Sequence, residues 1–141
     1  MSADRRVYPR AKLKWPVVIK TKEGNRDGAT LNITPDGCFI RCPEPLKLNV
    51  VFDMGIKVPK TKATIAATAE VVWSNIYGPD DEITPRGMGV RFIKISSEAR
   101  KFIAQASLEY FKAMKDEVQP ELLQTLSTLV IDLSEEPHKN K

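Results

Sequence analysis

Two short clusters near the start of the chain carry side chains that could hold an anion. Arg6-Val7-Tyr8-Pro9-Arg10 places two guanidinium groups four residues apart, directly after Arg5. About twenty residues further on, Asn32-Ile33-Thr34-Pro35-Asp36-Gly37 supplies an amide, a hydroxyl and a glycine. A guanidinium fork binds paired phosphate oxygens, or the O6 and N7 acceptors of guanine, in a bidentate manner. Together the clusters predict a sensor of a small anionic nucleotide rather than a catalyst.

The distribution of charge singles out the first cluster. Residues 1–14, here called the basic arm, hold five basic residues and one acid, Asp4, so their net charge of +4 equals that of the whole chain. A concentrated positive charge attracts an anion more strongly than a diffuse one. A solvated, flexible tail is the ordinary alternative for such a segment. We expect residues 1–14 to form a flexible arm that contributes to binding.

The elements that must position these clusters are mainly β-strands. Short apolar runs separated by turn residues predict six strands, at 15–20, 29–33, 37–42, 46–54, 63–75 and 87–93. The segment Lys22–Gly28 is rich in Gly, Asn and Asp and is predicted to be a turn. The pattern favours a small antiparallel barrel or sandwich spanning residues 15–95.

The apolar period then changes to that of helices. Ser96 can cap an amphipathic helix over residues 96–119, and Pro120 favours a boundary. Residues 120–141 are predicted to form an extra amphipathic helix with a polar tail. Its apolar residues, here called the leucine stripe, need burial on the barrel or on another chain, and a homodimer through residues 121–133 is one way to provide it. The stripe consists of Leu122, Leu123, Leu126, Leu129, Val130 and Leu133.

These motifs resemble those of PilZ domains, the bacterial receptors for cyclic di-GMP. The family pattern RxxxR, then (D/N)xSxxG, is similar to Arg6–Arg10 and Asn32–Gly37, with Thr34 where Ser is most frequent. The stretches Glu70-Val71-Val72-Trp73 and Gly87-Met88-Gly89-Val90-Arg91-Phe92 also look like the family. The resemblance covers about residues 4–110. It implies a six-stranded PilZ-like barrel with C-terminal helices, cyclic di-GMP as the ligand, and an arm that folds over it.

The resemblance and the side-chain chemistry suggest a role for each site residue. Arg5, Arg6 and Arg10 are suited to grip phosphate or guanine. Asn32 can present its amide to a guanine edge, and the Thr34 hydroxyl can donate or accept a hydrogen bond. Gly37 allows a close backbone approach or a positive φ, although an ordinary turn also explains it. Trp73 is favoured as a core or barrel-rim residue, and the alternative is that it borders the ligand.

Catalytic and metal sites find no support in the sequence. The only histidine is His138, and no Walker glycine loop is present. Cys38 and Cys42 lack partners for a zinc site, and we interpret them as reduced thiols. No apolar run approaches the roughly 18 residues of a membrane span. We therefore expect a cytoplasmic binding protein that is not an enzyme and has no cofactor.

Three functions remain open at this stage. The first is a cyclic di-GMP receptor that changes conformation and signals to a protein partner controlling motility, adhesion or exopolysaccharide. The second is a degenerate PilZ-like interaction module that binds no nucleotide. The third, a nucleic-acid binder using the basic arm, is disfavoured because residues 15–141 are neutral overall and carry no aromatic stacking stripe. No nucleic-acid polymer is expected as a partner.

Overall fold

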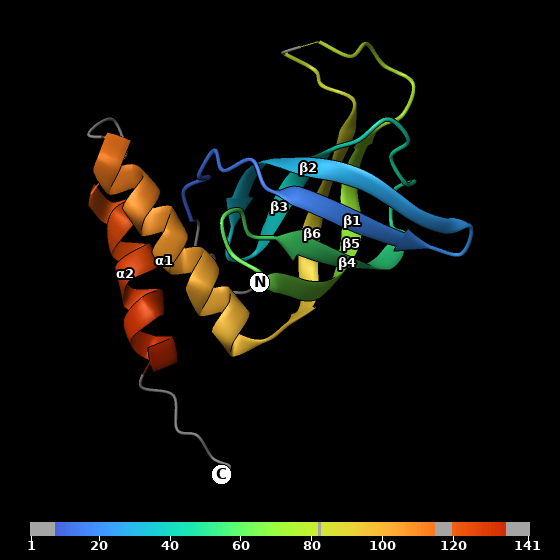
Figure 1. Ribbon diagram of the computed structural model, residues 1–141. Coiled ribbons are helices and arrows are strands. Elements are labelled where there is room, and N and C mark those ends of the chain that lie inside the picture. The colour runs from blue at the N-terminus through green and yellow to red at the C-terminus, as the bar shows by residue number, and fades with distance from the viewer. Residues whose placement is uncertain (1–7, 82, 115–119, 135–141) are drawn as a thin grey trace, which may run out of the picture.

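A six-stranded antiparallel barrel with a pair of helices beside it makes up the described fold (Figure 1). The structure is a computed structural model, and it describes residues 8–81, 83–114 and 120–134. The predicted mainly-β barrel with C-terminal helices is confirmed. The elements are β1 (Pro16–Thr21), β2 (Gly24–Thr34), β3 (Gly37–Arg41), β4 (Val51–Lys57), β5 (Thr64–Asn75), β6 (Gly87–Ile95), α1 (Ser97–Met114) and α2 (Pro120–Ser134).

The barrel closes in the order β1-β2-β3-β6-β5-β4, and every neighbouring pair is antiparallel. Side chains alternate between the two faces of a strand, so each strand sends one set of apolar residues inward. Ile19, Ile33, Ile40, Ile56 and Val71 are all fully buried in this interior. The alternate residues of each strand lie on the outer face of the barrel.

Two sequence-based boundaries are wrong. The predicted turn over Lys22–Gly28 is limited to Lys22 and Glu23, because residues 24–28 pair with β1 from Thr21↔Gly24 to Val17↔Gly28. Gly24 permits the tight reversal with a φ of 121°. The strand predicted at residues 46–54 begins only at Val51, and Asn49 adopts a left-handed φ of 73° before it.

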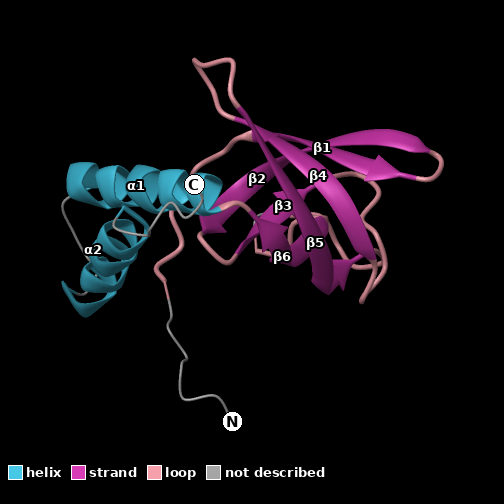
Figure 2. Cartoon of the chain, turned by 90° about the horizontal axis from the view of Figure 1, so that it is seen from below, coloured by secondary structure: helices cyan, strands magenta, loops and turns pink. Residues whose placement is uncertain are grey.

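The helices form a second apolar cluster with the basic arm. Helix α1 starts as predicted, with the backbone N–H of Ala99 donating to Ser96 Oγ at 3.0 Å. Leu126 and Leu129 of α2 pack with Tyr8 of the arm and Phe111 of α1. Within the leucine stripe, Leu126 and Leu129 are buried where α2 packs on α1 (Figure 2), and Leu123, Val130 and Leu133 are partly buried there. The homodimer through residues 121–133 stays a prediction, because packing within the chain covers only part of the stripe.

Among the described residues, neither helix is long and apolar enough to cross a membrane.

Candidate ligand-binding site

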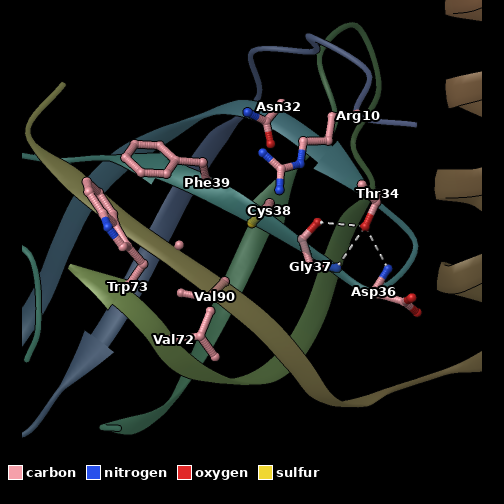
Figure 3. A pocket seen from close by; sticks show the side chains of 11 residues that line it. Arg10, Asn32, Thr34, Asp36, Gly37, Cys38, Phe39, Val72, Trp73 and Val90 are labelled. Atoms are coloured by element: carbon pink, nitrogen blue, oxygen red, sulfur yellow. Dashed lines mark hydrogen bonds between the residues drawn. The ribbon is translucent and has the colours of Figure 1, made fainter. Parts of the chain in front are cut away.

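A pocket of about 490 Å³ opens on the outer face of β2, β3, β6 and β5 (Figure 3). Strand register aligns Asn32, Phe39, Gly89 and Trp73 in one cross-strand row. The next row contains Thr34, Gly37, Arg91 and Glu70. The pocket is lined by Arg10, Asn32, Thr34, Asp36, Gly37, Cys38, Phe39, Val72, Trp73, Gly89 and Val90. Its volume falls within the range typical of small-molecule sites.

A β-bulge turns Asn32 toward this pocket. The register of β2 against β3 shifts between Thr30 and Asn32. Thr30 is fully buried, and its hydroxyl oxygen accepts a hydrogen bond from the backbone N–H of Trp15 at 2.9 Å. In a regular strand Asn32 would share that inward face, because side chains two residues apart point the same way. The extra residue at the bulge sends Asn32 to the outer face instead.

A second bulge does the same for Trp73. The register of β5 against β6 shifts between Val71 and Trp73, so the inward alternation of Val71 is not continued two residues later. Trp73 is 45% exposed and lines the pocket. The sequence favoured either the core or the barrel rim for Trp73, and its exposure shows that the core position is wrong. The residue lies near the end of β5, on the outside of the barrel.

The rings of Phe39 and Trp73 pack against each other and line the pocket, and they are here called the aromatic wall. Their ring centroids are 5.5 Å apart with an interplanar angle of 46°. Gly89 lies between them in the register and contributes no side chain, so the two rings meet across it. Exposed aromatic faces of this kind can stack on a nucleobase.

The basic arm places Arg10 at the pocket. Its neighbours Tyr8 and Ala11 are 6% and 0% exposed. The backbone of Ala11 exchanges two hydrogen bonds with Ile33 of β2, at 3.1 and 2.9 Å. The Arg10 side chain points into the pocket and forms no hydrogen bond or ion pair within the described part of the chain (Figure 3). Arg5 and Arg6 lie outside the described residues.

The remaining predicted site residues divide into two kinds. The Asn32 side chain lines the pocket and forms no hydrogen bond to another described residue. Thr34 is used by the turn itself, since its Oγ1 accepts hydrogen bonds from the backbone N–H groups of Asp36 at 3.0 Å and Gly37 at 3.2 Å. Gly37 has no positive φ, and it is needed because β6 leaves no room for a side chain there.

The sequence analysis did not single out Phe39 or Asp36 as pocket residues, nor Arg100 as the partner of Asp36. Asp36 is the only lining residue with a carboxylate, within the described residues. The Oδ1 atom of Asp36 lies 2.7 Å from Nη2 of Arg100, a residue of α1. No local pattern could reveal this contact, because 64 residues separate the partners.

The two cysteines are buried thiols. Burial raises the pKa of Cys38 to about 12. Burial also raises the pKa of Cys42 to about 11, with Arg26 opposing the rise. Both groups therefore stay protonated at neutral pH, which suits packing and not nucleophilic chemistry. The described residues contain no cluster of three or more His, Cys, Asp or Glu that could hold a metal ion.

Comparison with known proteins now identifies the family. The model of the PilZ domain matches residues 4–109. The chain belongs to the PilZ domain family. The match includes both motif clusters and all six strands, so the family assignment covers the whole pocket. A search of curated proteins gave no match.

Solved structures share the fold at low sequence identity. The inhibitor of motility MotI/DgrA of Bacillus subtilis matches with a TM-score of 0.65 and 19% identity, over 80% of this chain and 53% of that one. The PilZ domain of YcgR from Escherichia coli, solved with c-di-GMP, matches with a TM-score of 0.60 and 10% identity, over 79% and 95%. This chain thus spans about half the length of the Bacillus protein.

Proposed function

We propose that this PilZ domain is a receptor for cyclic di-GMP and binds it in the pocket over β2, β3, β6 and β5. The proposal rests on Arg10. Its guanidinium is unpaired within the described structure and points into a pocket that is also lined by Asn32 and the aromatic wall. The family assignment supports the same ligand, as does the likeness to the YcgR PilZ domain that was solved with c-di-GMP.

Each group in the pocket has a task that its chemistry suits. Arg10 grips a phosphate or the O6 and N7 edge of a guanine, and Arg5 and Arg6 of the arm join it. Asn32 offers its amide to a guanine edge. Trp73 and Phe39 provide a face on which a guanine stacks. Thr34 and Gly37 act mainly by shaping the turn, because the Thr34 hydroxyl is occupied there.

The output of the receptor is a change of conformation read by a protein partner, and the ligand itself undergoes no chemistry. Control of motility, adhesion or exopolysaccharide is the process we assign to that partner. A cytoplasmic location agrees with two buried, reduced thiols.

Calorimetric titration with cyclic di-GMP tests the ligand. Arg10→Ala should weaken binding by about 1.5–3 kcal/mol, the cost of losing a charge-assisted hydrogen bond, and Asn32→Ala should also weaken it. Lys12→Ala is the matched control, because it removes the same charge from an exposed arm residue outside the pocket. Absence of binding by the wild-type protein, or equal affinity of the Arg10 and Lys12 variants, would contradict the proposal.

The second candidate, an interaction module that binds no nucleotide, is favoured by one observation. Tyr77 and Ile83, in the connection between β5 and β6, are 90% and 92% exposed. Large apolar side chains that are this accessible suit a protein contact. Two results together would support this alternative over the receptor: association of the full chain in sedimentation, and no detectable heat of binding in the titration with cyclic di-GMP.

A further inference from the structure

Arg100 of α1 contacts both motif clusters, although it belongs to neither. Its guanidinium pairs with the carboxylate of Asp36 at 2.7 Å. The same group lies over the ring of Tyr8, with Cζ 5.9 Å from the centroid, a geometry suited to a cation–π contact. Asp36 belongs to the turn beside the pocket, and Tyr8 belongs to the arm that carries Arg10. Arg100 therefore contacts both the turn at Asp36 and the arm at Tyr8, the two segments between which the ligand is proposed to bind.

The charge of Asp36 gives this contact a direct bearing on an anionic ligand. Asp36 lines the pocket, and its side chain is 53% exposed. An unpaired carboxylate at that position would repel a phosphate, and the repulsion would be partly screened by salt. Arg100, whose side chain is 31% exposed, offsets this charge and holds it on the side of α1.

The Tyr8 contact bears on the arm. Tyr8 is 6% exposed in the cluster formed with α1 and α2, and Arg10 follows it by two residues. A cation over the ring adds a polar contact to this apolar anchor. The placement of Arg10 thus depends on the same guanidinium that neutralises Asp36.

We propose that Arg100 is a positioning residue of the pocket, which neutralises Asp36 and fixes the arm through Tyr8. The inference rests on the proposed binding of cyclic di-GMP. Arg100 acts through these two residues and does not itself contact the ligand.

A double-mutant cycle separates the electrostatic role from a general effect on folding. Arg100→Gln should weaken cyclic di-GMP binding by about three- to tenfold, and more at low salt, as expected for a charge near the rim. Asp36→Asn should bind at least as tightly as the wild-type protein. Adding Asp36→Asn to Arg100→Gln should recover part of the lost affinity, because it removes the repulsion by Asp36 but does not restore the cation over Tyr8. This recovery is the non-additivity of directly interacting residues. Arg100→Lys should recover only part, because it keeps the charge and loses the planar group over Tyr8.

Lys112→Gln is the control, since it removes the same charge from an exposed position on the same helix. Equal affinity of Arg100→Gln and Lys112→Gln would overturn the inference, as would a defect that Asp36→Asn leaves unchanged. Amide NMR spectra of the ligand-free protein provide the second readout. Arg100→Gln should shift the signals of both the arm at Tyr8 and the turn at Asp36, and Lys112→Gln should leave both in place.

Failure of the proposed function looks different. If the wild-type protein does not bind cyclic di-GMP, that function is wrong, and the NMR comparison alone decides whether Arg100 positions the arm and the turn. Unchanged arm or turn signals in Arg100→Gln would overturn the positioning role in either case.

Discussion

The backbone of Val90 passes directly against Gly37. A Cβ atom at Gly37 would lie well inside van der Waals contact with the Val90 carbonyl oxygen and 3.0 Å from Cα of Arg91. Because the obstacle is backbone, no side-chain rotation can relieve it. We expect Gly37→Ala to lower the free energy of unfolding by about 1–3 kcal/mol, the usual cost of overpacking. Urea denaturation measures the change.

Gly89→Ala is the control for this prediction. It is also on the outer face of the barrel, yet its added Cβ would meet only ordinary contacts, 3.6 Å to Trp73 Cβ and 3.9 Å to Phe39 Cδ2. Its stability should stay within about 0.5 kcal/mol of the wild-type value. If Gly37→Ala is tolerated equally well, the close approach of β6 does not explain the glycine.

We expect the Thr34 hydroxyl to affect stability and ligand affinity through the turn that it stabilises. Thr34→Val removes the oxygen that accepts from Asp36 and Gly37, at about 0.5–1.5 kcal/mol for each neutral hydrogen bond lost. Thr34→Ser retains the oxygen and should keep both stability and affinity near the wild-type values. Denaturation and calorimetry on the pair of variants check this. Full affinity in Thr34→Val would show that the turn does not need the hydroxyl for binding.

Trp73 should report on ligand binding. Stacking of a base on an aromatic ring contributes about 1–3 kcal/mol, so Trp73→Ala should weaken cyclic di-GMP binding by that amount and Trp73→Phe by less. The other of the two tryptophans, Trp15, is buried at 7% exposure. A ligand-induced change in fluorescence should therefore vanish in Trp73→Phe. A change that persists there would place the responding tryptophan elsewhere.

The buried thiols should make the fold less stable at high pH. An unfolded thiol ionises near its ordinary pKa of 9.0, but burial keeps Cys38 protonated to about 12 and Cys42 to about 11. Above pH 9 the unfolded state therefore binds fewer protons, and stability falls as pH rises through this window. Urea unfolding at pH 7, 9 and 10.5 measures the decline. The variant with Cys38→Ala and Cys42→Ala should decline less steeply, and equal slopes would exclude the thiols as a cause.

The sequence predicts the architecture well because alternation and helical spacing are local properties. Six apolar runs with turn residues between them correspond to six strands, and Ser96 caps α1. Helix α2 begins at Pro120, and the end predicted for the first helix, at residue 119, lies outside the described residues. The prediction of a turn over residues 22–28 was wrong because the Gly and Asp residues within it pair with β1. Strand pairing is decided by the partner strand and not by local preference.

The site was predictable only where its motifs are contiguous. Asn32 and Thr34 were placed at the pocket by motif, but the face of Trp73 depends on a bulge that apolar periodicity does not reveal. The link from Asp36 to Arg100 depends on how α1 docks against the barrel. Tertiary packing sets both, so a linear pattern contains no signal for them.

Closure of the barrel limits how a protein partner can recognise this domain. Each of the six strands has two hydrogen-bonded neighbours in the order β1-β2-β3-β6-β5-β4, so no described strand is unpaired along a whole side. Addition of a partner strand requires unpaired backbone groups. In the described sheet these are limited to strand ends that extend past a neighbour, such as residues 24–28 of β2, which pair with β1 alone. Recognition by a partner should therefore rely mainly on side chains of the helices, the loops or the barrel wall, and a sequence change there can alter partner choice without disturbing the sheet.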